Sequence, residues 1–195
     1  MKNITATIIT IGDELLIGQV IDTNSAWMAQ ELNRIGITVS RRIAVGDDRD
    51  AIWNMLDLEL PVSDIVLLTG GLGPTADDIT KPLLCDYFGG KMVVDEKVLN
   101  HLKYLSEKVF QRQLLERNAR QAEVPDVCQV LHNANGTAPG MWFEKNDHIL
   151  VSLPGVPFEM KGLMSSQVLP AFRSHFKLPA ISHRTLLTAG IGESY

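Results

Sequence analysis

Several features are scarce in this sequence, and each scarcity excludes a class of protein. The chain has only two cysteines, Cys85 and Cys128, and no Cys-x-x-Cys or His–Cys cluster, so no structural zinc site is visible. No apolar run approaches the ~20 residues that cross a bilayer. The formal net charge is −5, which disfavours a nucleic-acid partner. With no signal peptide at the start, we expect a cytoplasmic protein with reduced thiols and no membrane partner.

What remains is the composition of an ordinary folded domain. The chain has 195 residues, of which 45% are hydrophobic and 21% charged. A chain of this length is about one domain, or one domain with the start of a second. It can bury roughly 70% of its unfolded surface, so it needs neither disulfides nor metals to fold.

β-Branched runs alternate with stretches of helical periodicity along the first 90 residues. The alternation predicts right-handed βαβ units and therefore an α/β fold with a mostly parallel sheet. We expect strands over 4–11, 37–45, 64–69, 127–131, 140–144, 148–153 and 182–189. We expect helices over 23–35, 47–58, 77–88, 96–121 and 158–172.

A glycine-rich loop, TGGLGPTADD over residues 69–78, follows the third strand. Its glycines let the backbone approach a ligand closely, and the helix behind them offers free N–H groups to phosphate. The candidate phosphate-binding residues are Gly70, Gly71, Gly73, Pro74 and Thr75. The loop is neither a P-loop nor the dinucleotide fingerprint, which would need a glycine at Ala76. A plain tight turn with a helix N-cap remains the alternative.

Acidic pairs follow three of the expected strands. In a parallel sheet the carboxyl ends of neighbouring strands meet at one edge, where ligands bind. Carboxylates beside a phosphate cradle favour a hard divalent ion. The alternative for each pair is ordinary enrichment of acids at helix N-termini. The pairs are Asp13 with Glu14, Asp47 with Asp48, and Asp77 with Asp78.

Two further loops and one basic segment complete the candidate features. Asn135, Gly136 and Thr137 lie in a turn-rich loop that either contacts phosphate or ribose or is simply a hairpin loop. Pro154 and Gly155 follow a strand and precede a helix. The basic residues of 97–120 alternate with glutamates, so we interpret them as a solvated face rather than a polyanion site. They are Lys97, Lys103, Lys108, Arg112, Arg117 and Arg120.

Taken together, these motifs resemble the molybdopterin-binding (MoaB/MogA-like) domain family, and most closely its CinA, competence/damage-inducible, branch. The matching segments, in the family's order, are TIGDELLIGQ at 10–19, VGDD at 45–48, TGGLGPTADDIT at 69–80, NARQA at 118–122, NGTAPGM at 135–141 and LPGVPFEM at 153–160. The resemblance covers residues 4 to about 192.

The resemblance implies a three-layer α/β/α fold and a small-molecule nucleotide or pterin as ligand. It also implies hydrolysis of ADP-ribose to AMP and ribose 5-phosphate, with a divalent metal (Mg or Co) and potassium. The metal ligands would be Asp13, Asp47, Asp77 and Asp78, and the catalytic residues Asp47, Asp78 and Glu14. Asp78→Asn is then expected to abolish turnover without unfolding the chain. A homo-oligomer, dimer or trimer, is implied as well.

Two other functions stay open at this point: adenylyl transfer to molybdopterin, and a non-catalytic nucleotide- or pterin-binding oligomerisation module. We expect the molybdopterin-binding domain to occupy residues 1–172. Residues 173–195 would form a linker and the truncated start of a second small domain, because the sequence ends just after an expected strand. A natural terminus with an edge strand is the alternative.

Overall fold

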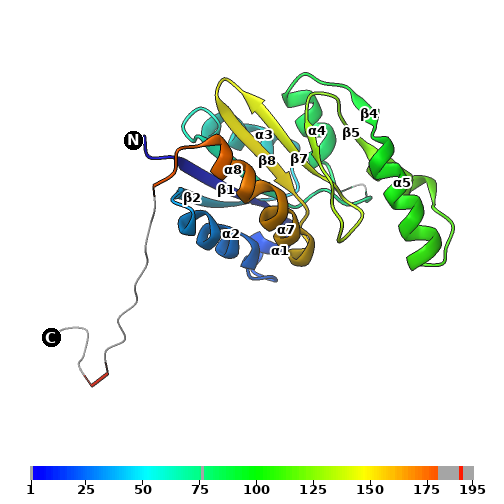
Figure 1. The fold of residues 1–195 in the computed structure, drawn as a ribbon, viewed down its shortest axis with the longest axis horizontal. Helices are drawn as coiled ribbons and strands as arrows, with labels where there is room; N and C mark the ends of the chain where they lie inside the picture. The colour runs from blue at the N-terminus through cyan, green and yellow to red at the C-terminus, as the bar shows by residue number, and fades with distance from the viewer. Residues whose placement is uncertain (1, 76, 180–188, 191–195) are drawn as a thin grey trace.

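A six-stranded sheet organises the chain in the computed structural model, which describes residues 2–75, 77–179 and 189–190. Its strand order is β2-β1-β3-β8-β7-β6, and the first four strands are parallel (Figure 1). The last two, β7 and β6, run antiparallel to their neighbours. The strands are β1 (Thr5–Ile11), β2 (Thr38–Val45), β3 (Ile65–Thr69), β6 (Gln129–Leu131), β7 (Gly140–Lys145) and β8 (His148–Leu153). The predicted mostly parallel α/β sheet is confirmed.

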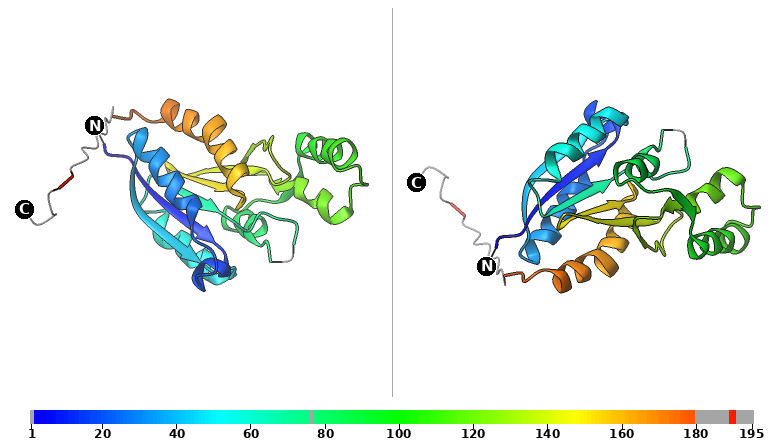
Figure 2. Two further views of the ribbon diagram at one scale, coloured as in Figure 1. Left: turned by 90° about the horizontal axis from the view of Figure 1, so that it is seen from below. Right: turned by 90° about the horizontal axis from the view of Figure 1, so that it is seen from above.

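Helices cover both faces of the sheet and give three layers (Figure 2). On one face pack α2 (Thr23–Arg34), α7 (Pro157–Leu163) and α8 (Leu169–His175), the last two joined by a π-helical turn, Met164–Val168. On the other face pack α3 (Arg49–Glu59) and α4 (Thr80–Tyr87).

Alternation along the strands supplies both cores. Ile8 of β1 packs with α2 residues such as Met28, whereas the next residue, Ile9, packs with Ile52 of α3. The side chains of Ile8, Ile9, Met28 and Ile52 are all fully buried. Near-continuous apolar strands of this kind are typical of a parallel sheet that is covered on both faces.

The expectation of one long helix over 96–121 is wrong. Helix α5 (Glu96–Tyr104) continues into a π-helical turn (Leu105–Val109), and the chain then reverses at Gln111, which has φ 51°. A short helix α6 (Glu116–Ala119) and a 3-10 turn (Arg120–Ala122) bring it back. Charged periodicity alone did not reveal the reversal, because Gln111 is not a residue that marks a left-handed turn.

The returning chain forms a small second sheet. Strand β4 (Met92–Val94) pairs antiparallel with β5 (Glu123–Pro125). Together with α5 and α6 these strands form what we call the insert, residues 92–125, which lies at one end of the main sheet (Figure 2). Its own small core contains Val98, Leu102 and Ala122. Strand β4 was not predicted because it is three residues long and exposed.

Three boundaries differ from the sequence prediction for local reasons. Helix α4 begins at Thr80 rather than at residue 77, because the Asp78 side chain is engaged in the preceding loop. The strand expected over 127–131 is shortened to β6 by a turn after β5. The strand expected over 182–189 lies almost wholly outside the described residues. Within the described ranges, none of the helices has the length and apolarity needed to cross a bilayer.

Candidate functional site

The carboxyl ends of β1, β2, β3 and β8 meet at one edge of the sheet, as predicted. Gly12, after β1, donates its amide to the carbonyl of Val45 at the end of β2 (3.0 Å). Gly70, after β3, donates to the carbonyl of Leu153 at the end of β8 (3.2 Å). The loops that carry the candidate residues therefore start from one line of adjacent strand ends.

Gly70 is required by the way its loop crosses β1. Its φ is 112°, and a Cβ at this position would lie 2.3 Å from the carbonyl oxygen of Ile11. A backbone atom cannot move aside as a flexible side chain can, so only glycine fits. The first glycine of the loop thus shapes the edge of the sheet, whatever it contacts in a ligand.

Asp13 and Asp47 form a reciprocal pair across β1 and β2. The Asp13 amide donates to Oδ2 of Asp47 (3.1 Å), and the Asp47 amide donates to Oδ1 of Asp13 (3.2 Å). Burial raises the pKa of Asp47, the hydrogen bond from Asp13 lowers it, and the negative charges of Asp13, Glu14 and Asp78 raise it further. The three neighbouring acids therefore disfavour the charged form of Asp47.

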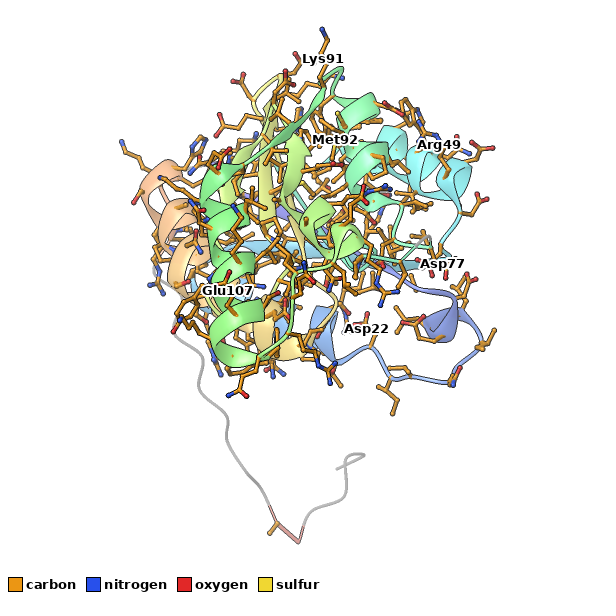
Figure 3. The ribbon with its side chains drawn as sticks, turned by 90° about the vertical axis from the view of Figure 1, so that its right-hand side faces the viewer. Asp22, Arg49, Asp77, Lys91, Met92 and Glu107 are labelled. Carbon is orange, nitrogen blue, oxygen red and sulfur yellow. The ribbon has the colours of Figure 1, made fainter. Side chains whose placement is uncertain are left out.

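Asp78 holds the glycine-rich loop. Its Oδ1 accepts the amide of Gly73 (2.7 Å), and its Oδ2 accepts both the amide (3.0 Å) and the hydroxyl (2.5 Å) of Thr75. Its neighbour Asp77 is exposed and lies at the molecular surface (Figure 3). Both oxygens of Asp78 are thus used locally, which adds a structural role to the catalytic and metal-binding roles predicted for it.

The predicted metal ligands do not form a closed metal cage. Among the residues the structure describes, no three His, Cys, Asp or Glu side chains are placed to hold a metal ion. The Asp13–Asp47 pair does offer hard oxygen donors with an excess of negative charge. A magnesium ion commonly takes one or two carboxylates and completes its shell with substrate phosphates and water. The residues present fit that kind of metal, which arrives with a phosphate compound.

A cavity of about 150 Å³ opens beside these carboxylates, between β1, β3 and the residues that follow α1 (Asp13–Leu16). We call it the carboxylate-edge cavity. Glu14, Gly70 and Gly155 line it together with Asn24, whose Nδ2 donates to the Gly155 carbonyl (2.7 Å). Its apolar wall consists of Ile11, Leu15, Val20 and Ile21. Pro154 lies just behind, buried, with its carbonyl accepting the Thr69 hydroxyl (2.9 Å).

Sequence reasoning missed Asn24 as a site residue. Its Oδ1 is buried, and no partner for it lies within the described part of the chain. An unpaired buried acceptor next to a cavity is a position where a ligand donor would be accommodated. The available signal was the position of Asn24 two residues after Asp22, whose side chain caps α2 by accepting the Ser25 amide (2.9 Å).

A second, larger cavity of about 440 Å³ separates the glycine-rich loop from the insert. We call it the loop–insert cavity. Gly73, Pro74 and Thr75 form its wall on the loop side. On the other side lie Lys81, Met92, Arg117, Arg120, Gln121 and Glu123. Arg117 and Arg120 are exposed, as the interpretation of the basic segment as a solvated face predicts, and they also line this cavity.

The loop of Asn135, Gly136 and Thr137 packs elsewhere. Gly136 and Thr137 line a third cavity of about 220 Å³ together with His101 and His132. A Cβ at Gly136 would lie 2.1 Å from Cδ of Glu159, so this glycine is explained by packing. Neither cavity beside the glycine-rich loop includes these three residues in its lining.

Glu159 holds the same loop through a hydrogen bond. It accepts a hydrogen bond from Nδ2 of Asn133 (2.6 Å), and that Nδ2 also donates to the Ala138 carbonyl (2.9 Å). Burial raises the pKa of Glu159, although the bond from Asn133 lowers it. The loop is thus a rigid, internally bonded turn, as the hairpin interpretation predicts.

Comparison with known proteins places this geometry in a family. The family described as "Probable molybdopterin binding domain" matches residues 7–174. A CinA-like protein from Flavobacterium psychrophilum is 50% identical over 189 residues, covering 97% of this chain and 45% of the relative. A CinA-like protein from Cytophaga hutchinsonii is 48% identical over 192 residues, covering 98% and 46%. The chain thus spans about half the length of these curated relatives.

Solved structures agree with the assignment. The protein CinA from Thermoplasma acidophilum, described as of unknown function, superposes with a TM-score of 0.76 and 34% identity over 89% of this chain and 99% of that one. The tungsten cofactor synthesizing protein MoaB from Pyrococcus furiosus shares the fold alone, with a TM-score of 0.57 and 20% identity over 89% and 98%. The chain therefore belongs to the molybdopterin-binding domain family and, within it, to the CinA-like proteins.

Proposed function

We propose that this chain hydrolyses the diphosphate bond of a nucleoside diphosphate compound of the ADP-ribose type, giving AMP and ribose 5-phosphate. The observation that supports this most is the Asp13–Asp47 pair, which lies on the same sheet edge as the glycine-rich loop. Acidic side chains repel a polyphosphate unless a cation accompanies it, so the arrangement favours metal-assisted chemistry over simple anion binding.

Each part of the edge has a distinct task in this proposal. The carboxylate-edge cavity, with its apolar wall, would bind the planar heterocycle of the nucleoside. Oδ1 of Asn24 would accept a hydrogen bond from that heterocycle. The glycines of the loop from Gly70 to Thr75 would let its backbone approach the diphosphate closely. Asp78 keeps that loop in shape through its bonds to Gly73 and Thr75.

Asp13 and Asp47 would hold the divalent ion, Mg or Co, with Asp77 as an outer ligand and potassium as a second cation. When bound, the metal neutralises developing charge on the phosphoryl group and lowers the pKa of water. Glu14 lines the cavity and would accept the proton of the attacking water. Water adds to one phosphorus, and the bond from the bridging oxygen to that phosphorus breaks, so both products carry a phosphate.

The family description supports a second candidate, adenylyl transfer to molybdopterin. That reaction would place a pterin in the carboxylate-edge cavity and a nucleotide along the loop. The 92–125 insert, which forms one wall of the loop–insert cavity, favours the hydrolase instead, because it points to the CinA branch of the family. A third candidate is a binding module without turnover, because a rigid loop and two cavities serve binding equally well.

The decisive experiment is to incubate the purified chain with ADP-ribose, magnesium or cobalt, and potassium, and to measure AMP. Metal-dependent AMP that falls at least 100-fold in Asp47→Asn supports the hydrolase. Asp50→Asn, an exposed acid in the first turn of α3, is the matched control and should keep full activity. Nucleotide binding without AMP in any metal would favour the module, and AMP transfer to molybdopterin would favour the transferase.

We also propose that the chain is a homo-oligomer, dimer or trimer. Several large apolar side chains near the carboxylate-edge cavity are exposed, and such patches are common at subunit contacts. They are Leu16 (56% exposed), Ile17 (75%), Val20 (50%), Ile21 (84%) and Phe158 (70%). Light scattering of the eluted protein should give a multiple of 21.6 kDa, and Ile21→Lys should shift it to the monomer.

A further inference from the structure

Lys81 is a buried cation without a counterion at hydrogen-bond distance. It is 7% exposed, and its Nζ donates to the carbonyls of Gln121 (2.8 Å) and Glu123 (3.2 Å). No carboxylate of the described residues forms a salt bridge with it. Burial lowers the pKa of Lys81 to about 8, while the charges of Glu123 and Asp78 raise it, so the ammonium stays charged near neutral pH. Its charge is available to stabilise an anion in the loop–insert cavity beside it.

Gln121 presents an unused donor at the same place. The residue is 2% exposed, and its Nε2 has no hydrogen-bond partner among the residues that the structure describes. Its Oε1 faces Nζ of Lys81 (3.4 Å), so turning the amide over would set two donors against each other. The amide orientation is therefore fixed by the lysine, and the Nε2 of this cavity-lining residue lacks an acceptor.

Two arginines add to this donor set. Arg117 and Arg120 line the cavity and are exposed. Among the described residues, the one ion pair of Arg120 is a long contact of 3.8 Å with Glu116, whose side chain is 90% exposed. Two acidic side chains of the cavity lining, Asp78 and Glu123, would repel an anion. Asp78 accepts three hydrogen bonds from the loop, so Glu123 is the one without such bonds from the loop. Guanidinium groups with free N–H donors bind phosphate in a bidentate manner.

We propose that the loop–insert cavity binds the sugar-phosphate end of the substrate, the part that leaves as ribose 5-phosphate. This assignment rests on the hydrolase proposed above and specifies which end of its substrate binds in this cavity. Gly73, Pro74 and Thr75 belong both to this cavity and to the loop that would hold the diphosphate. The cavity near Asn24, at the start of the loop, offers an apolar wall, whereas this one, at the end of the loop, offers charged and polar donors. The nucleoside and the sugar phosphate would therefore bind at the two ends of the loop.

The test is a calorimetric titration of the metal-free chain with ribose 5-phosphate, repeated with Arg120→Ala, Gln121→Glu and Arg112→Ala. Arg120→Ala and Gln121→Glu should each weaken binding at least 10-fold. Gln121→Glu keeps the acceptor for Lys81 but replaces the donor by a negative charge. Arg112→Ala removes an exposed arginine of the same insert that does not line the cavity, and it should bind as the unmodified chain does. AMP, titrated in parallel, should bind equally well to the Arg120→Ala chain.

Absence of ribose 5-phosphate binding to the unmodified chain, or equal affinity in Arg120→Ala and Arg112→Ala, would overturn the assignment. Because Arg120 is exposed, its removal leaves the fold intact, so the test does not depend on Gln121→Glu folding. The assay needs no turnover, which separates the two proposals. Binding of ribose 5-phosphate that depends on Arg120, without hydrolysis of ADP-ribose, would refute the hydrolase but retain a sugar-phosphate site. Hydrolysis of ADP-ribose, with binding that does not depend on Arg120, would retain the hydrolase but refute the sugar-phosphate site.

Discussion

Replacing Asp78 by asparagine tests whether this carboxylate acts through the loop. Asp78 accepts three hydrogen bonds, from the Gly73 amide, the Thr75 amide and the Thr75 hydroxyl. An asparagine has one acceptor oxygen, so its NH₂ group must face at least one backbone N–H donor. One bond is lost and the others lose their charge assistance, which halves their strength. Since the loop is accessible to water, we expect a loss of about 1–2 kcal/mol in the free energy of unfolding.

The assay is urea denaturation together with amide hydrogen exchange over residues 70–80. Asp78→Asn should lower the urea midpoint and remove protection at Gly73 and Thr75. Asp77→Asn is the control, because no described residue donates a hydrogen bond to that exposed carboxylate. Unchanged protection at Gly73 and Thr75 in Asp78→Asn would refute the loop role and leave only a direct role at the metal or substrate. We therefore expect Asp78→Asn to keep the sheet and to loosen the loop.

Three further perturbations test other parts of the structure. Gly70→Ala should cost about 2–3 kcal/mol of stability in urea denaturation, because the new methyl meets the Ile11 carbonyl at a φ of 112°; Gly89→Ala, at φ 71° with no atom within 4 Å, should cost less. The pKa of Lys81 falls to about 8 in the folded chain, so the unfolded chain binds more protons between pH 8 and 10.5. Stability should therefore rise over that range in urea melts, and the rise should vanish in Lys81→Met. Hydrogen bonds lower the pKa of Asp64 in the folded chain despite its burial, so its contribution to the free energy of unfolding is present above about pH 4 and is lost as the pH falls through the folded pKa. In urea melts, Asp64→Asn should therefore reduce the loss of stability at acid pH.

Local patterns were enough to predict a mostly parallel sheet and the edge at which its strand ends meet. The β-branched runs and the glycines that follow them determine where the strands end, and parallel pairing brings those ends together. Asp13 and Asp47 were therefore placed correctly on one edge from residue order alone. The predicted roles of these carboxylates in metal binding and catalysis remain predictions.

The cavities were beyond sequence reasoning, because they depend on contacts across long separations. Arg120 lines the same cavity as the glycine-rich loop because the chain reverses at Gln111, where no glycine or asparagine marks the turn. Lys81 gave no signal either. It lies within an apolar stretch of α4, and its partners, Gln121 and Glu123, follow 40 and 42 residues later.

The acidic pairs show why the structural and the functional interpretations of such residues are both needed. In two pairs one member serves the fold: Asp48 caps α3 by accepting the Ala51 amide (2.8 Å), and Asp78 ties the glycine-rich loop. The other members of these pairs are Asp77, which lies at the surface, and Asp47, which contacts Asp13. Because burial and nearby acids raise the pKa of Asp47, a cation bound at this edge would stabilise its charged form. Magnesium should therefore lower the pKa of Asp47, measured by carboxyl NMR titration, and an unchanged pKa would place the metal elsewhere.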